Sequence, residues 1–179
     1  DLQVLNYKMQ MVLQRHLEGR GLGNQFACPA LPDTPAEAVP VIENAIDGQS
    51  PGGVTFIGSS LGGYYATWLA EKLGCRAVLI NPAITPHVGL AVYLGTQKNL
   101  HTGEPYELTR AHLDGWRRLQ VDRIDPERYL LLLETGDEVL DWREAARKYE
   151  GARMVIRQGG DHSLQCFAEM IPRILAFCA

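Results

Sequence analysis

The sequence predicts an α/β fold in which a mainly parallel sheet of about five or more strands carries helices on both faces, making three layers. Three observations predict it. Short apolar runs alternate along the chain with segments whose apolar residues recur at helical spacing. The strongest apolar runs contain almost no polar residues, as expected of strands buried on both faces. The 179 residues are 46% hydrophobic and 21% charged, which suits a single globular domain over 1–179.

The first half of the chain predicts three helices and three strands. Apolar residues at helical spacing predict a helix from Leu5 to about Gly19. Phe26–Leu31 is a short strand candidate that prolines interrupt. A helix follows it to about residue 46, with Asp33 or Thr34 as its N-cap. The remaining expected elements are a compact strand over 54–57, a sparsely charged helix over 60–73 and a buried strand over 77–80.

The second half begins with a looser pattern over 85–121, where glycines, prolines and aromatic residues interrupt the periodicity. Only 109–119 predicts a clear helix there. We expect this segment to form a lid or an acyl pocket, lined by Tyr93, Tyr106 and Trp116. The alternative is that these aromatic side chains simply pack over the sheet.

Two further strand–helix pairs follow this loose segment. The almost wholly apolar run Tyr129–Leu133 predicts a strand. Asp141 resembles the first residue of a capping box and predicts a helix to about residue 149. Met154–Ile156 predicts the next strand, and Ser163 is expected to cap a last helix that reaches residue 177.

Composition narrows the function classes. The net charge is −4, so the chain lacks the basic excess that would favour nucleic acid as a partner. Its apolar stretches are far shorter than the roughly 20 residues of a membrane-spanning helix. The four cysteines form no CxxC pair and no zinc spacing, which predicts a reduced, cytoplasmic protein without a metal site.

One motif carries chemistry, the pattern G-x-S-x-G formed by Gly58, Ser60 and Gly62. It stands between a predicted strand and a predicted helix, the setting of a nucleophile elbow. Residues two before and two after the nucleophile crowd each other in such a turn, which requires glycine at both places. Ser60 meets this requirement, whereas Ser59 is flanked by larger residues. Ser60 is therefore the candidate nucleophile, and the backbone N–H of Leu61 is a candidate oxyanion donor.

A serine hydroxyl needs a base, and a late histidine suits this topology. His162 lies just after the last predicted strand and before the last helix, where ligands meet such sheets. None of the other four histidines follows a strand in this way: His16, His87, His101 and His112.

The matching acid should follow the strand that ends near residue 133. Asp137 comes first after the Gly136 turn and is favoured. Asp141 is the main rival, although it suits a helix cap, and Glu138 has a longer and less defined reach. The chain order Ser60, Asp137 and His162 is that of the α/β-hydrolases.

With these residues identified, the chain resembles the α/β-hydrolase superfamily and, more closely, its YqiA-like esterase family. The resemblance covers nearly the whole chain from Lys8 onward and implies an α/β-hydrolase fold. It also implies a small cytoplasmic esterase that acts on short acyl esters without a cofactor, and Ser60, Asp137 and His162 match the family's triad positions. The segments that carry the resemblance are 29–32, 58–69, 81–83, 93–95, 102–103, 135–141 and 159–162.

The chain departs from this family at its start. The family opens with a strand and a His-Gly-Phe loop that should supply a second oxyanion donor, and nothing similar precedes Leu5. We therefore expect an N-terminal segment to have been removed, or to exist outside this sequence. Two alternatives to a simple esterase stay open, namely an acyl-CoA thioesterase and a non-catalytic binding module on a hydrolase scaffold. In the catalytic interpretations the partner is a small-molecule ester or acyl-CoA.

Overall fold

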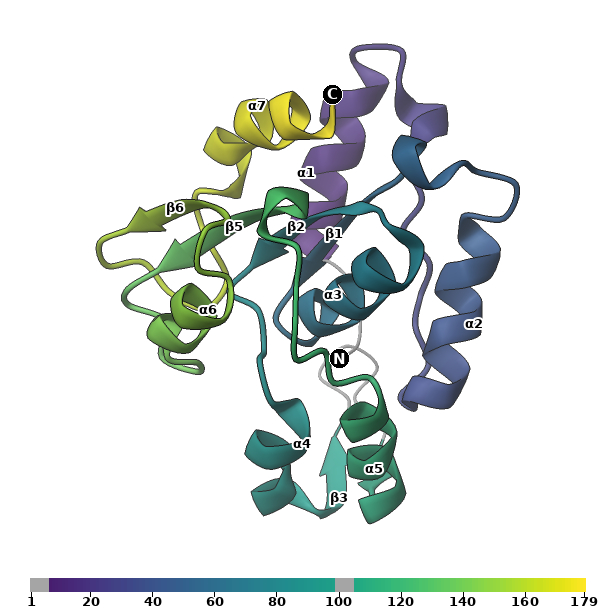
Figure 1. The fold of residues 1–179 in the computed structure, drawn as a ribbon, viewed down its shortest axis with the longest axis vertical. Helices are drawn as coiled ribbons and strands as arrows, with labels where there is room; N and C mark the ends of the chain where they lie inside the picture. The colour runs from purple at the N-terminus through teal and green to yellow at the C-terminus, as the bar shows by residue number, and fades with distance from the viewer. Residues whose placement is uncertain (1–6, 99–104) are drawn as a thin grey trace.

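Four parallel strands form the central sheet of the protein, which a computed structural model describes over residues 7–98 and 105–179 (Figure 1). They are β1 (Thr55–Ser59), β2 (Arg76–Ile80), β5 (Tyr129–Glu134) and β6 (Arg153–Arg157). The spatial order is β1-β2-β5-β6, and every pairing is parallel. The carboxyl ends of all four strands therefore meet at one edge of the sheet, which we call the rim.

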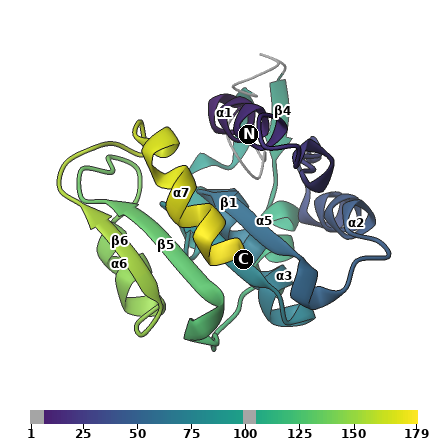
Figure 2. The same ribbon diagram turned by 90° about the horizontal axis from the view of Figure 1, so that it is seen from above.

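Helices cover both faces of this sheet, as Figures 1 and 2 show. One face packs against α1 (Tyr7–Glu18) and α7 (Phe167–Cys178). The other packs against α2 (Pro35–Ala45), α3 (Leu61–Leu73) and α6 (Trp142–Lys148). Successive residues of β2 alternate between the two cores, with Ala77 and Leu79 in one and Val78 and Ile80 in the other. The predicted three-layer α/β architecture is confirmed.

Residues 86–98 and 105–118, which we call the cap segment, form a separate set of elements beside the sheet (Figure 1). They are α4 (Pro86–Gly89), the 3₁₀ turn Leu90–Tyr93, the antiparallel strands β3 (Gly95–Lys98) and β4 (Pro105–Leu108), and α5 (Arg110–Arg118). Buried hydrogen bonds attach α5 to α3. The Tyr64 hydroxyl donates to the Trp116 carbonyl at 2.7 Å, and the Trp116 indole N–H donates to the Tyr65 hydroxyl at 2.9 Å.

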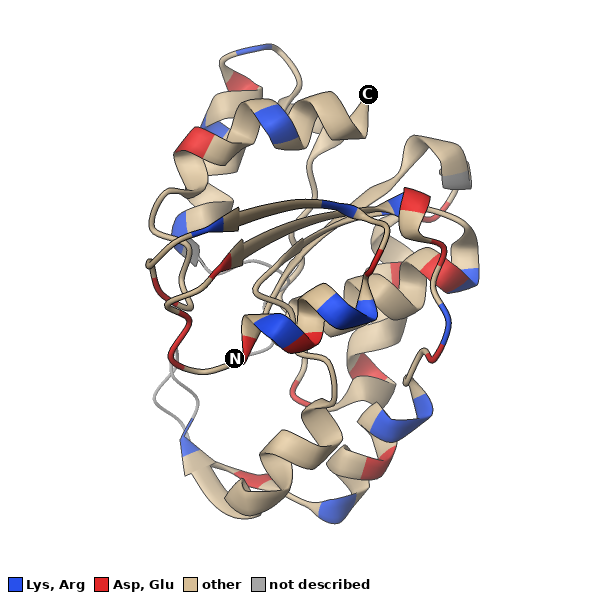
Figure 3. Ribbon diagram, turned by 60° about the vertical axis from the view of Figure 1, so that its left-hand side comes forward, with Lys and Arg blue, Asp and Glu red and all other residues tan. Residues whose placement is uncertain are grey.

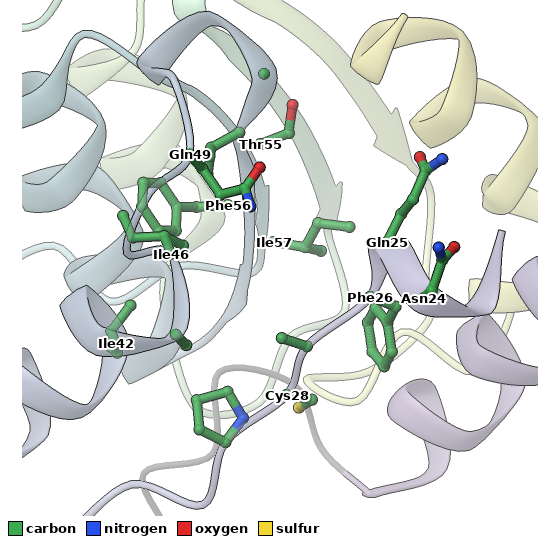
Figure 4. A pocket seen from close by; sticks show the side chains of 15 residues that line it. Asn24, Gln25, Phe26, Cys28, Ile42, Ile46, Gln49, Thr55, Phe56 and Ile57 are labelled. Carbon is green, nitrogen blue, oxygen red and sulfur yellow. The ribbon is translucent and has the colours of Figure 1, made fainter.

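The strand expected over 26–31 is wrong, and the sheet has four strands among the described residues where five or more were expected. This segment is irregular and follows a 3₁₀ turn, Gly23–Gln25. A strand needs a neighbour that accepts its backbone hydrogen bonds. In the described part of the chain, β1 pairs only with β2, and a cavity of about 430 Å³ separates its other edge from residues 24–29 (Figure 4).

Helix boundaries agree with the local capping signals except at the last helix. Thr34 caps α2 and Asp141 caps α6, as predicted. Ser163 does not cap α7, because that helix begins only at Phe167. The backbone N–H of Ser163 instead donates to the side chain of Asp161 at 2.8 Å, within a turn that precedes the helix. The first helix is described from Tyr7, so its expected start at Leu5 lies outside the described residues.

Acidic and basic residues occur close together along several helices in the ribbon of Figure 3. None of the described helices combines the length and apolarity needed to cross a membrane.

Candidate active site

Ser60 occupies a sharp turn between β1 and α3. Its backbone angles are φ 53° and ψ −122°, a conformation that L-residues rarely adopt. A Cβ atom at Gly58 would lie 2.3 Å from the carbonyl oxygen of Gly62, so the turn closes only with glycine at 58. This is the steric requirement that the motif predicted. The turn is held by two hydrogen bonds, from the Ser60 N–H to Ile80 (2.9 Å) and from the Ala83 N–H to the Ser60 carbonyl (3.0 Å).

The structure brings His162 and Asp137 together at the rim. Asp137 follows β5 and His162 follows β6, and these strands are neighbours in the sheet. Nδ1 of His162 lies 2.8 Å from Oδ2 and 3.0 Å from Oδ1 of Asp137. Because an ionised carboxylate only accepts hydrogen bonds, the imidazole donates from Nδ1 and leaves Nε2 free to accept a proton.

The Asp137 carboxylate is nearly inaccessible to solvent, since its side chain is 1% exposed, against 19% for His162. Its Oδ1 also accepts the backbone N–H groups of Val139 (2.8 Å) and Leu140 (2.9 Å). These bonds fix the carboxylate and so define the orientation of the imidazole.

The two rival acids have other contacts. Glu138 accepts the backbone N–H of His162 at 3.0 Å, so it contacts the loop rather than the imidazole. Asp141 accepts the N–H of Arg143 at the start of α6, and this hydrogen bond lowers the pKa of the exposed Asp141 carboxyl. Of the three acids considered, Asp137 is the one that contacts the His162 ring.

Ser60 lies at the same rim, two strands away from Asp137. Its hydroxyl makes no hydrogen bond to His162 within the described residues, so the structure joins the acid and the base but leaves the nucleophile unpaired. Catalytic hydrogen bonds are often long without substrate and tighten in the complex. The backbone N–H of Leu61 opens α3, has no partner among the described residues, and faces no side-chain cap.

The aromatic residues of the cap segment differ in exposure. Tyr93 is 56% exposed, whereas Trp116 is 3% exposed and belongs to the core around α3. Tyr106 packs partly buried against the same core, and this burial raises the pKa of its hydroxyl. The position of Trp116 favours the packing alternative over an open substrate contact.

Sequence reasoning missed two residues beside the site, Asn81 and Glu134. Both are buried polar side chains at the rim, 2% and 3% exposed, and both contact the loop that carries His162. From the sequence, Asn81 belongs only to the segment 81–83 that carries the family resemblance, and Glu134 has no predicted role. The positions directly after two wholly apolar strands were the signal that could have found them.

Cys75, Cys166 and Cys178 are free thiols, and Cys75 is buried. Desolvation raises the pKa of its thiol. Within residues 7–98 and 105–179, no group of three or more His, Cys, Asp or Glu side chains is placed to hold a metal ion.

The elbow and the imidazole–carboxylate pair both lie in the part of the chain that matches a family model. Residues 5–179 match the model of a family described as "Uncharacterised protein family (UPF0227)". The chain belongs to this family. The match confirms the resemblance to the YqiA-like proteins that the motifs indicated.

Solved structures of this fold are also similar to the chain. A monoacylglycerol lipase from Paleococcus ferrophilus superposes with a TM-score of 0.66 and 17% identity, covering 98% of this chain and 90% of that one. The esterase domain of a Rhodothermus marinus protein superposes with a TM-score of 0.59 and 20% identity, covering 95% of this chain and 79% of that one. Mouse alpha/beta hydrolase domain-containing protein 10 superposes with a TM-score of 0.57 and 16% identity, covering 80% of this chain and 68% of that one. The protein therefore has the α/β-hydrolase fold.

Proposed function

We propose that this protein hydrolyses short-chain carboxylic esters through an acyl-enzyme formed on Ser60. The observation that supports this most is the His162–Asp137 hydrogen bond of 2.8 Å, at the same rim as a serine held on a strained elbow. The parallel strand order places the ends of β1, β5 and β6 at one edge of the sheet, where a nucleophile, an acid and a base can act together. A nucleophile, a base and an orienting acid are what acyl transfer requires.

The chemistry proceeds in two steps. Nε2 of His162 takes the hydroxyl proton of Ser60 as its oxygen attacks the ester carbonyl, and the same proton passes to the departing alcohol when the C–O bond breaks. Water then attacks the acyl-Ser60 carbonyl, with His162 again removing a proton, and releases the carboxylic acid with free Ser60. Asp137 holds the imidazole in the required tautomer and stabilises its charged form throughout.

The backbone N–H of Leu61 supplies one donor to the oxyanion, at the positive end of the α3 dipole. Loss of a single oxyanion donor typically costs about 10²–10³-fold in turnover. We therefore expect this N–H to be assisted by a second donor. The cap segment, with the exposed Tyr93 and the half-buried Tyr106, is our candidate for the lid or acyl pocket.

Labelling with a fluorophosphonate tests the nucleophile directly. We expect the wild type and Ser59→Ala to react and Ser60→Ala to stay unlabelled, with p-nitrophenyl acetate hydrolysis following the same pattern. Ser59 is a matched control because it is the adjacent serine at the end of β1. A wild-type protein that neither reacts with the label nor hydrolyses any ester would overturn the proposal. The non-catalytic binding module would then be the remaining interpretation.

The acyl length and the thioester alternative need a substrate panel. We expect kcat/KM on p-nitrophenyl esters to fall as the acyl chain lengthens beyond a short chain. Esters and acyl-CoA thioesters of equal acyl length should be compared under identical conditions. A preference for the thioester would replace the esterase by a thioesterase that uses the same three residues.

A further inference from the structure

Three buried polar or charged residues are found in the described part of the chain, and two of them lie at the rim. Thr67 sits inside α3 and bonds to Tyr149. Asn81 follows β2, and Glu134 ends β5. Burying an amide or a carboxylate costs free energy unless each polar atom is hydrogen-bonded. The partners of these two side chains therefore show what their burial achieves.

Asn81 joins three separate pieces of backbone. Its N–H donates to Leu132 (3.1 Å), and its Oδ1 accepts the N–H of Glu134 (3.0 Å). Its Nδ2 donates to the carbonyls of Asp161 (3.2 Å) and His162 (3.1 Å). With φ at 39°, the residue lies in the left-handed region, which asparagine tolerates better than most residues. The amide thus ties the end of β5 to the base loop, residues 158–163.

Glu134 holds the peptide that precedes those held by Asn81, in the same loop. Its Oε2 accepts the N–H of Asp161 at 2.8 Å, and its Oε1 lies 3.7 Å from Sγ of Cys166, which donates to it. A Cβ atom at Gly160 would lie 2.2 Å from this carboxylate, so Glu134 packs directly against the base loop where glycine leaves room. Next to it, the Gly136 N–H donates to the Gly159 carbonyl at 2.8 Å.

The segment that contains Asn81, residues 80–83, also holds the backbone of Ser60. Ile80 accepts the N–H of Ser60, and Ala83 donates to the Ser60 carbonyl, so residues 80–83 contact the elbow on both sides of Asn81. The side chain of Asn81 meanwhile contacts the backbone of His162. Residues 80–83 therefore contact the backbone of both residues between which a proton must move.

We propose that Asn81 and Glu134 are positioning residues that hold the backbone on both sides of Asp161, and with it the imidazole of His162, in register with Asp137 and the Ser60 elbow. This inference rests on the proposed function, because it concerns the base of that reaction. Neither side chain contacts the reacting atoms. Each acts through the backbone of the base loop, and displacement of a catalytic group by about 1 Å can cost 10²-fold in rate.

Asn81→Gly tests the amide without adding backbone strain, because glycine adopts a positive φ readily. We expect kcat for a short-chain p-nitrophenyl ester, and the rate constant of fluorophosphonate labelling, to fall about 10²-fold with KM nearly unchanged. For Glu134 the pair of variants is Glu134→Ala, expected to show a similar loss, and Glu134→Gln, whose side-chain oxygen can still accept the Asp161 N–H and should restore most of the rate.

A second readout does not depend on activity. The Nδ1 proton of His162, shared with Asp137, should give a low-field proton NMR resonance in the wild type and in Glu134→Gln. This resonance should be lost or broadened in Asn81→Gly and Glu134→Ala. Tyr149→Phe is the matched control, since it removes a buried hydrogen bond of 2.7 Å to Thr67 away from the base loop.

The outcomes separate the two proposals. If the wild type reacts and both Asn81→Gly and Glu134→Ala keep its rate constant and resonance, the positioning role is wrong. An equal loss in Tyr149→Phe would likewise assign the effect to general stability. Should Asn81→Gly not fold, the Ala and Gln variants of Glu134 decide alone. If the wild type does not react but its resonance depends on Asn81 and Glu134 as described, the positioning stands and the esterase proposal fails.

Discussion

The rim and the cap segment are attached to the sheet in different ways. The rim loops are held by hydrogen bonds between backbone and buried side chains, such as those of Asn81 to the base loop. The cap segment is held mainly through the aromatic side chains Tyr64 and Tyr65 of α3, which bond to Trp116. The cap also exposes large apolar side chains, with Val92 81% and Tyr93 56% exposed.

The two kinds of attachment suit different needs, namely fixed atomic positions at the rim and a variable outer surface in the cap segment. Directional hydrogen bonds fix the atoms that must transfer a proton, and a change there disrupts chemistry. Contacts of an aromatic cluster fix a whole element but leave its outer surface free to vary. We expect substitutions at the rim to change kcat, and substitutions in the cap segment to change KM, acyl preference or local stability.

The largest effect is expected for Gly58→Ala at the rim. Its Cβ would clash with the Gly62 carbonyl at 2.3 Å, so the elbow must open and the free energy of unfolding should fall by about 3 kcal/mol, with loss of esterase activity. Urea denaturation measures the first and ester hydrolysis the second. The matched change in the cap is Gly89→Ala, where a Cβ meets nothing within 4 Å and should be harmless. Equal stability of the two variants would contradict this division.

Asp137→Asn is expected to lower kcat by about 10³–10⁴-fold with little change in stability. An amide at this position favours the wrong tautomer of His162, so Nε2 no longer accepts the serine proton. Asp141→Asn is the control, because asparagine caps a helix about as well as aspartate. Steady-state kinetics on a p-nitrophenyl ester measures both. Similar losses in the two variants would remove Asp137 from the proposed site.

Tyr65→Phe should act on the attachment of the cap. It leaves the buried indole N–H of Trp116 without its acceptor, at a cost of about 1–3 kcal/mol. Hydrogen exchange should therefore speed up in α5 more than in β5, with kcat for an acetyl ester largely retained. Tyr93→Phe, which alters an exposed hydroxyl, serves as the control. A loss of kcat without faster exchange would mean that the cap and the rim are not separable.

The smallest effect concerns pH and the cap segment. Desolvation lowers the pKa of His87, the nearby charge of Arg117 lowers it further, and Nδ1 of His87 has no hydrogen-bond partner among the described residues. The unfolded chain, with its ordinary histidine pKa near 6.5, then binds the proton more readily. The stability contributed by neutral His87 is present above that pH and is lost as the pH falls below it.

Hydrogen exchange in α4 and α5 at pH 7 and pH 5 measures this loss. Faster opening at pH 5 is expected in the wild type and should be reduced in His87→Gln. His16→Gln, in α1 and outside the cap, is the control. An unchanged pH dependence in His87→Gln would assign the acid sensitivity to another group.

Much of this arrangement could be predicted wherever the signal was local. The apolar run of β5 and the caps Thr34 and Asp141 depend on neighbouring residues, and the structure places them as expected. The elbow glycines follow from a steric rule over five residues. The strand over 26–31 failed because a strand depends on a partner, and the described residues supply none beside it.

The supports of the site depend on distant residues in the same way. Asn81 and Glu134 contact residues about 80 and 27 positions away in sequence, so their place after an apolar strand marks them as candidates but does not reveal their partners. Ser163 was predicted as a helix cap on local grounds, but α7 begins only at Phe167. The N–H of Ser163 donates to the Asp161 side chain in the turn before that helix. The sequence thus predicts which groups do chemistry more readily than which groups hold them.

The contact between Glu134 and Gly160 also has an evolutionary consequence. The carboxylate fills the place where any side chain at 160 would begin. A mutation that introduces a side chain at 160 is therefore harmful unless residue 134 shrinks in the same lineage, and a smaller residue at 134 gives up the acceptor for Asp161. Glycine at 160 and glutamate at 134 should therefore be kept together or lost together across relatives.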